Sequence, residues 1–278
     1  MVERKDWASY LTHISLIIGI AIICFPIYLT LVASTVTQED ILTPPLPLLP
    51  GPHLIENYTK ALFSGVNVPV ARMLMNSIIM ALGITIGKIT ISILSAYAIV
   101  YFRFPFRMWF FWAIFLTLML PVEVRIVPTY EVVASLGLLN SHAGLILPLI
   151  ASATATFLFR QFFLTIPNEL IEAAKVDGAG PLRFFKDILL PLSTTNIAAL
   201  FVILFIFGWN QFLWPLLITT KPEMNTIVMG LKQMIPIADD FTDWPVVMAT
   251  AILAVLPPIA IVVIMQRLFV KGLVENEK

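Results

Sequence analysis

Long apolar runs alternate with short polar segments along this chain. Residues 14–38 and 188–220 contain no charged side chain, and shorter apolar runs fill much of the remaining sequence. A helix that crosses a bilayer needs about 20 mainly apolar residues. On this criterion we predict an all-α integral membrane protein with six spans, at about 14–34, 73–101, 108–128, 143–163, 193–219 and 245–266.

The six predicted spans make up one domain. It covers residues 14–268 and includes a charged segment at 164–191. Residues 1–13 and 269–278 are predicted to form its short polar ends.

The first apolar run resembles the core of a secretory signal, but no small-x-small cleavage pattern follows it. The run continues past Pro26, so we expect a retained first span. The proline-rich segment 35–72 is expected to be an exposed loop with a short helix at about 56–63. Residues 129–142 and 220–244 are predicted to be further polar connections.

Two prolines interrupt the third predicted span. Pro121 and Pro128 flank Glu123 and Arg125, so we expect the helix to be kinked or broken there. Only fifteen residues separate Arg107 from Glu123. They make about 22 Å of helix, against a hydrocarbon core of about 30 Å. Glu123 and Arg125 are therefore expected at membrane depth or at the far interface.

The composition agrees with a membrane protein and excludes several other classes. The chain is 59% hydrophobic and 12% charged, with a mean hydropathy of +0.93, whereas soluble domains carry about 25% charged residues. The net charge of zero gives no indication of a nucleic-acid partner. A single cysteine, Cys24, excludes an intrachain disulfide and a cysteine metal cluster. We expect no metal site, because His13, His53 and His142 are far apart in the sequence.

The distribution of basic residues predicts the orientation in the membrane. With both termini in the cytoplasm, the inner segments hold Arg4, Lys5, Arg103, Arg107, Arg160, Lys175, Arg183, Lys186, Arg267, Lys271 and Lys278. The outer segments then hold only Lys60, Arg72, Arg125, Lys221 and Lys232, and Lys88 lies within a span. Because basic residues collect in cytoplasmic loops, we place both termini and residues 164–191 in the cytoplasm.

Helix signals are dense in the first part of the charged segment. Pro167 suits a first helical turn, and Glu169 follows at the positive end of the helix. We expect this helix to run to about Val176, with Gly178 as its left-handed cap.

A second short helix is predicted to begin at Pro181. Leu182, Phe185 and the pair Ile188 and Leu189 are expected to share one face. Arg183 can pair with Asp187 at i, i+4, and Pro191 should end the helix before the fifth span. From these signals alone, the segment could be a solvated loop at the membrane surface or a surface that binds another protein.

A string in the second span partly matches a phosphate-binding loop. The string is GITIGKIT, residues 83–90. The match fails because Leu82 stands where the first glycine is required and Ile89 where Ser or Thr is required. We therefore expect no nucleotide site, and no cofactor, on this chain.

The charged segment carries a specific motif. Its sequence EAAKVDGAGPLRFFKDILLP resembles the EAA loop in the membrane subunits of ABC importers, with every anchor present: Glu172, Ala173, Ala174, Gly178, Ile188, Leu190 and Pro191. Similarity extends to NSIIMALGIT, LSAYAIVYFRFP, SLGLLNSHAGLILP, FRQFFLTIPNELIEAAKVDGA, GWNQFLWPLL and MQRLFVKGL. This set resembles the carbohydrate-uptake permeases, and among them the second membrane subunits of sn-glycerol-3-phosphate importers.

The resemblance implies a type I ABC importer permease with a two-helix cytoplasmic coupling loop. It implies a second permease subunit, an ATPase dimer that binds ATP and Mg²⁺, a periplasmic solute-binding protein, and a bacterial inner membrane location. Residues expected in the ATPase-coupling loop are Glu169, Glu172, Ala173, Ala174, Asp177, Gly178, Phe185 and Pro191. Residues expected to contact the ATPase from the tail are Gln266, Arg267, Lys271 and Gly272.

Candidate residues for the translocation pathway lie at membrane depth. They are Lys88, Glu123, Arg125, Trp209, Asn210, Gln211 and Trp214. Ionisable residues are costly there and usually functional, and an Arg fork fits phosphate oxygens. The alternative for each cation is an ion pair or a subunit contact, and for each Trp it is aromatic packing. Similar permeases carry Gln in the pattern that here reads PVEVR, residues 121–125.

The resemblance predicts a non-catalytic permease for sn-glycerol-3-phosphate or glycerophosphodiesters. A permease for a neutral sugar or oligosaccharide in the same family is the main alternative. A stand-alone secondary transporter would show paired broken helices in inverted halves, and an intramembrane enzyme would show a nucleophile or metal ligands within spans. The sequence shows neither pattern.

Overall fold

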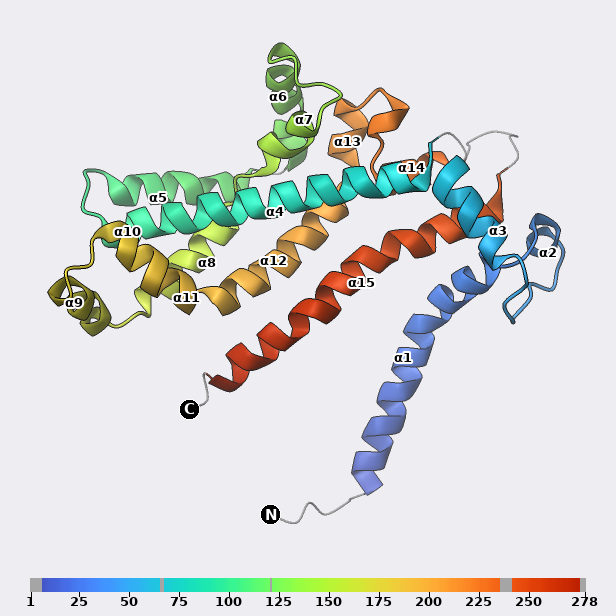
Figure 1. Cartoon of the computed structure of the whole chain (residues 1–278), viewed down its shortest axis with the longest axis horizontal. Coiled ribbons are helices and arrows are strands. Elements are labelled where there is room, and N and C mark those ends of the chain that lie inside the picture. Colours follow the sequence, from blue (N-terminus) through green and yellow to red (C-terminus); the bar gives the residue numbers. More distant parts are fainter. Residues whose placement is uncertain (1–6, 66–67, 121, 236–241, 276–278) are drawn as a thin grey trace. The chain divides into compact units, whose positions relative to one another are not determined.

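The computed structural model describes residues 7–65, 68–120, 122–235 and 242–275. Within these ranges the chain consists of helices and loops, with no strand (Figure 1). Chain contacts define two units, which are described separately. The first comprises residues 1–72 and 230–256, and the second comprises residues 73–229 and 257–278.

The helices follow one another in a simple order. They are α1 (Trp7–Ala33), α2 (Gln38–Leu42), α3 (Leu54–Thr59), α4 (Val70–Tyr101), α5 (Arg107–Leu116), α6 (Val122–Ser135), α7 (His142–Ile146), α8 (Ala153–Leu164), α9 (Asn168–Val176), α10 (Pro181–Phe184), α11 (Leu190–Leu192), α12 (Thr194–Trp209), α13 (Leu213–Ile218), α14 (Ile227–Gln233) and α15 (Trp244–Glu275).

In the first unit, α1 is apolar on all sides and exposes nearly all of its length. Ile17 and Ile23 are among its many exposed large side chains, and burial begins only at Val32. A helix that is apolar all round is typical of a membrane span. The segment Tyr10–Ala33 meets the length and hydropathy of a span, in agreement with the first predicted span.

A capping box begins α2, a helix that the sequence analysis did not predict. The Thr37 side chain accepts a hydrogen bond from the Asp40 amide, and the Asp40 carboxylate accepts one from the Thr37 amide. The Thr37 hydroxyl also donates to this carboxylate and, as the main cause, lowers the pKa of Asp40 below its ordinary value. The T-x-x-D spacing was visible in the sequence.

The loop after α1 folds back on itself through buried polar contacts. The Asn57 side chain on α3 donates to the carbonyl oxygens of Ser34 and Val36, both at 3.0 Å. As expected, a helix covers much of residues 56–63, where α3 continues into a π-helical turn at Lys60–Ser64. These contacts close the loop against the end of α1 within the first unit.

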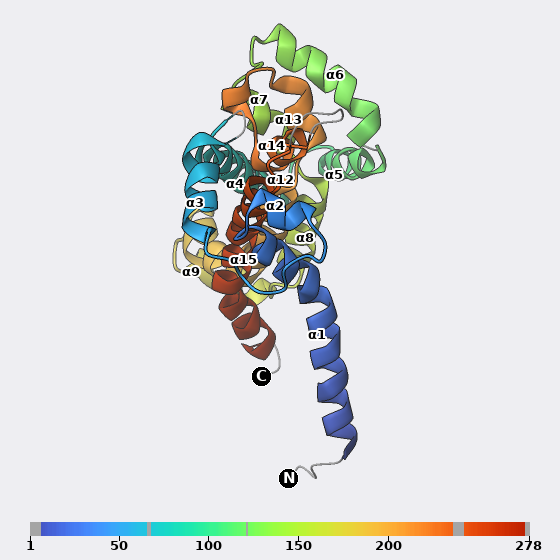
Figure 2. The ribbon, with the colours of Figure 1, turned by 90° about the vertical axis from the view of Figure 1, so that its right-hand side faces the viewer.

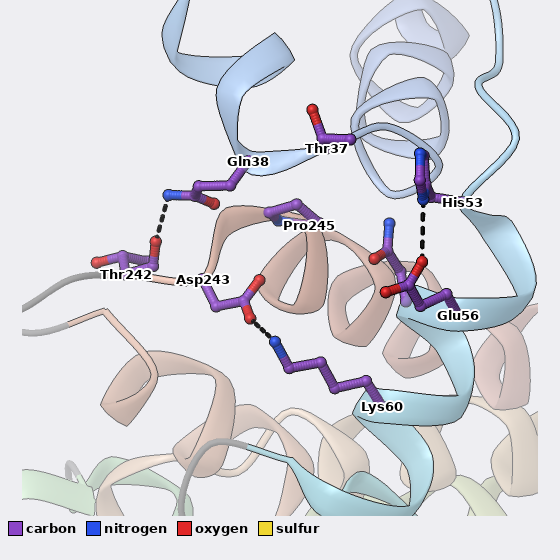
Figure 3. Close-up of a pocket in the computed structure, with 9 residues that line it drawn as sticks. Thr37, Gln38, His53, Glu56, Lys60, Thr242, Asp243 and Pro245 are labelled. Atoms are coloured by element: carbon purple, nitrogen blue, oxygen red, sulfur yellow. Dashed lines mark hydrogen bonds and ion pairs between the residues drawn. The ribbon is translucent and has the colours of Figure 1, made fainter.

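A polar pocket lies within this first unit, beside the start of α15 (Figure 3). Lys60 forms an ion pair with Asp243, and His53 lies 3.0 Å from Glu56. Gln38 donates to the Thr242 carbonyl at 2.7 Å. The polar groups of the pocket thus largely satisfy one another.

In the second unit, α4, α8 and α12 run side by side around a shared apolar core (Figures 1 and 2). The core is formed by Ile93 and Ala96 of α4, Phe159 and Phe163 of α8, and Leu204 of α12. The Val70–Tyr101 helix meets the criteria for a span, and so does Trp244–Gln266 within α15. These helices agree with the second and sixth predicted spans.

The third predicted span is not one continuous helix. Helix α5 ends at Leu116, a 3₁₀ turn covers Thr117–Met119, and Leu120 is extended at φ −88° and ψ 111°. Leu120 precedes a proline, and a residue in that position is disfavoured in helical conformation. Pro128, in contrast, lies inside α6, so the expected break occurs at one of the two prolines. Because α6 continues to Ser135, the prediction of a simple connection from residue 129 was wrong.

The fourth predicted span is a bent helix pair, and the helix of the fifth predicted span begins at a bend from the charged segment before it. The segments His142–Leu149 and Ala153–Leu164 meet at 49°, and Pro181–Leu192 and Thr194–Trp209 meet at 70°. Pro148 has no amide hydrogen to donate, which favours the first break. Together with the three long helices, the described residues contain three to five candidate spans.

The last helix is longer than predicted. α15 continues through Pro257 and Pro258 to Glu275, so the residues predicted as a polar tail after 268 begin as helix. The loop at 220–244 also contains α14, whose Ile227 and Met229 are buried. Asp239 and Asp240 of this loop lie outside the described residues.

Candidate functional site

The charged segment folds as two short helices about a glycine turn. Helix α9 ends in a motif in which the Ala179 amide donates to the Ala174 carbonyl at 2.8 Å and the Gly178 amide to Lys175 at 3.1 Å. Gly178 has φ +70°, the left-handed conformation that this motif requires. The predicted cap and the predicted end of the helix are therefore confirmed.

The second helix of the segment has a different buried face from the one predicted. Phe184 and Leu189 are buried, Phe185 and Ile188 are partly buried, and Leu182 is 84% exposed. A π-helical turn at 185–189 explains the difference, because its extra residue shifts the face along the helix. The predicted pair of Arg183 and Asp187 is present at 3.5 Å. Pro191 lies inside α11, one residue before the end of the helix at Leu192, so it does not itself end the helix.

Aromatic side chains hold this segment against the end of α4. The Tyr97 hydroxyl donates to the Pro181 carbonyl at 2.8 Å, and the Tyr97 ring lies 5.0 Å from the Phe185 ring. The Tyr101 ring meets the Phe184 ring edge-on at 5.4 Å. A force on the segment would therefore be transmitted to a membrane helix through packed rings rather than through a flexible loop.

The outer surface of α9 and the following turn is largely free of contacts within this chain. Glu172, Ala173 and Asp177 are exposed, and Val176 is 87% exposed. Ala174 instead faces the core, so the two alanines of the motif have different surroundings. A single exposed apolar side chain is common on protein surfaces and does not by itself identify a partner.

Two cavities of the second unit share a cationic boundary. The larger has a volume of about 470 Å³ and the smaller about 160 Å³, and Lys88, Arg125, Ala151 and Phe207 line both. The Lys88 side chain is only 8% exposed. Its Nζ lies 3.9 Å from the centre of the Phe207 ring, a cation–π contact.

No carboxylate within the described side chains pairs with Lys88 or Arg125. A buried or membrane-embedded cation is costly unless a counter-charge approaches it. The buried Lys88 is therefore the residue of this boundary that could pair with an anionic ligand.

Other predicted pathway residues have different positions. Gln211 and Trp214 line the smaller cavity. The Trp214 indole also donates to the Gly144 carbonyl at 3.2 Å, so this side chain has a structural partner. Trp209 is buried and stacks on Phe205, and neither it nor Asn210 lines either cavity. Trp209 instead ends α12, and Asn210 follows it in the break before α13.

For some of the predicted site residues the structure describes the backbone but not the side chain. The side chain of Glu123 is not described, although its backbone lies in α6. The same holds for Arg267, Lys271 and Gly272 on α15, whereas Gln266 is described and exposed.

The hydroxyl groups of the larger cavity could not be recognised in the sequence. Ser95, Thr117, Ser152, Thr154 and Thr156 all line it. Ser95 lies on α4, Thr117 in the turn after α5, and the other three at the start of α8, and Ser and Thr residues scattered in this way give no motif. The sequence did contain the glycine-rich string at 83–90. In the structure its glycines lie at a helix packing contact.

Two glycines of this string allow close packing on α4. A Cβ at Gly83 would lie 2.6 Å from Ile146 Cδ1, and one at Gly87 would lie 2.5 Å from Ile150 Cγ2. The two glycines, four positions apart, thus let the segment before α8 approach α4 next to Lys88.

Comparison with known proteins gives consistent results. A family model described as "binding-protein-dependent transport system inner membrane component" matches residues 88–275. The sn-glycerol-3-phosphate transport system permease protein UgpE of Agrobacterium fabrum is 63% identical over 282 residues, covering 100% of both chains. The proteins of that name from Brucella melitensis and Escherichia coli O1:K1 are 62% and 57% identical, again with 100% of both chains covered.

A solved structure has the same fold. It is described as the crystal structure of a bacterial ABC transporter involved in the import of the acidic polysaccharide alginate. The matching chain has a TM-score of 0.81 at 20% identity, and the match covers 96% of this chain and 99% of that one.

Proposed function

Because this chain belongs to the family of binding-protein-dependent transport system inner membrane components, we propose that it is a permease subunit of an ATP-driven importer of sn-glycerol-3-phosphate. It is a multi-pass, non-catalytic transport protein of the bacterial inner membrane. Relatives with this substrate in their names match it over their full length.

The observation that carries the substrate class is the cationic boundary of the two cavities. Lys88 is buried against the Phe207 ring and has no carboxylate partner among the described side chains. Arg125 lines the same space. A pathway for a neutral sugar gains nothing from a buried lysine that has no described carboxylate partner, because burial of the charge is costly. A phosphate ester would supply the missing negative charge.

In this proposal six segments cross the membrane. They are α1, α4, α5 with α6, α7 with α8, α12 with α13, and α15. The bias of basic residues toward one set of loops supports a cytoplasmic position for both termini and for residues 164–191.

The segment 164–191 would be the coupling loop. Helix α9 would bind a cleft of an ATPase dimer, with Val176 and the neighbouring carboxylates as its contact surface. ATP and Mg²⁺ would bind to that partner. Closure of the ATPase would push α9, and the aromatic contacts of α10 with Tyr97 and Tyr101 would transmit the movement to α4.

Membership of this family also implies two further partners. A second, homologous permease subunit would complete the pathway, and a periplasmic solute-binding protein would deliver the substrate to the outer loops. The end of α15, from Gln266, would contact the ATPase.

Cellular uptake tests the proposal. A bacterial strain without its own sn-glycerol-3-phosphate importer would express this chain together with its cognate second permease, ATPase and binding protein. We expect energy-dependent uptake of radiolabelled sn-glycerol-3-phosphate and its loss with an ATPase-dead partner. Uptake of a neutral sugar, with none of the phosphate ester, would refute the assignment of substrate.

A further inference from the structure

The break in the fourth span places the start of a helix at the larger cavity. Ala151, Ser152, Ala153 and Thr154 all line that cavity, and α8 begins at Ala153. The twelve residues of α8 make a helix long enough to carry a substantial dipole. The positive end of this dipole therefore faces the space bounded by Lys88.

The first amide groups of α8 are available to a ligand. The Ser152 side chain accepts a hydrogen bond from the Ala155 amide at 3.3 Å. The Thr156 amide donates to the Ser152 carbonyl at 3.1 Å. The amides of Ala153 and Thr154, as the first two of the helix, have no acceptor within it. Such donors at a helix start are well suited to bind an anion.

A second observation independently indicates a ligand at this position. Lys88 is more than nine-tenths buried and has only an aromatic ring as partner among the described residues. It lines the same cavity as Ala153 and Thr154. The close contact of Gly87 with Ile150 brings the helix start toward Lys88.

Two hydroxyl groups complete the surroundings. Ser95 lies two turns after Lys88 on the cavity side of α4, and Thr154 lies in the first turn of α8. Neither side-chain hydroxyl has a hydrogen-bond partner within the described chain. They are free to bond to the hydroxyl groups of a small polyol.

We infer that the start of α8, Lys88 and Arg125 together bind the phosphate group of a small phosphomonoester during translocation, and that Ser95 and Thr154 bind its polyol part. This inference rests on the proposed function and adds the site where the substrate is bound. The amides of Ala153 and Thr154 would supply directed hydrogen bonds, whereas the two cations supply charge.

A proline substitution tests the role of the backbone amide. Ala153→Pro removes one amide hydrogen at the first helical position, where proline is well tolerated. Ser152, at φ −148° and ψ 106°, already has the extended conformation favoured before proline. Ala153→Val is the matched control, because it adds similar bulk and keeps the amide hydrogen.

The assay is ATP-driven uptake of radiolabelled sn-glycerol-3-phosphate by the complete complex in liposomes, at saturating binding protein. We expect uptake by Ala153→Pro to fall about tenfold, the loss typical of one hydrogen bond to a charged acceptor. Ala153→Val should stay within about twofold of the wild type. Equal uptake by the two variants would overturn the inference.

Thr154→Val provides a second test that leaves the backbone unchanged. It removes the hydroxyl and keeps the amide, and we expect about a threefold fall in uptake. If Ala153→Pro does not assemble, unchanged uptake by Thr154→Val overturns the inference. A wild-type complex that does not take up sn-glycerol-3-phosphate would instead refute the proposed function.

Discussion

The glycine turn of the proposed coupling loop allows a sharp prediction, because its geometry separates backbone strain from steric clash. Gly178 has φ +70°, and a Cβ built there meets no atom within 4 Å. Gly178→Ala therefore changes only the backbone energy. A left-handed conformation costs a residue with a Cβ about 1–2 kcal/mol. The smaller entropy of the unfolded alanine chain offsets about 0.4–1 kcal/mol of this.

The expected net cost is about 1 kcal/mol, which is close to a fivefold change in a local equilibrium. Since the two hydrogen bonds from Gly178 and Ala179 close the turn, α9 should open more often. Gly180 is the matched control, because its φ is −71° and a Cβ there also meets no atom within 4 Å. Gly180→Ala should therefore leave the turn intact.

Two measurements on the reconstituted complex test this prediction. Hydrogen exchange of the Gly178 and Ala179 amides should be several-fold faster in the position-178 variant only. ATP hydrolysis stimulated by the binding protein should fall in that variant and stay normal in Gly180→Ala. Identical exchange and hydrolysis in both variants would refute the coupling role assigned to the turn.

Three further predictions concern other parts of the chain. Gly87→Ala would place a Cβ 2.5 Å from Ile150 Cγ2 and cost about 1–3 kcal/mol, so the thermal stability of the purified protein and its uptake rate should both fall. Phe184→Ala should cost about 3–5 kcal/mol and reduce stimulated ATP hydrolysis, whereas alanine at the exposed Leu182 should leave stability unchanged. Because its capping hydrogen bonds lower the pKa of Asp40, their contribution to α2 is full above the ordinary carboxyl pKa. It is lost as pH falls through the lowered value, and exchange protection of Gln38–Leu42 should follow that course.

The sequence predicted those features that depend on local patterns. Hydropathy identified α1, α4 and α15 because an uninterrupted apolar stretch of sufficient length has few alternatives. Gly178 was identified as a cap because few other residues adopt its conformation at low cost. The break after α5 was expected from Pro121, although Pro128 was tolerated inside α6.

Features that depend on packing could not be predicted from local patterns. The π-helical turn at 185–189 adds a residue to one helical turn, so an ideal period assigns the wrong face to Leu182. The role of Gly87 became apparent only when Ile150, more than sixty positions away, was found against it. Lys88 and Arg125 were chosen separately because of their cost in a membrane, and only the folded chain shows that they share a cavity.

The central claim is that this chain carries an anionic phosphate ester past Lys88, driven by ATP hydrolysis on a partner. The most direct measurement is the rate of sn-glycerol-3-phosphate uptake by the complete complex in liposomes carrying Lys88→Met. Lys221→Met is the control, because it removes an exposed lysine that lines neither cavity. We predict at least a tenfold fall with Lys88→Met and wild-type uptake with the control. Wild-type uptake in both variants would contradict the account.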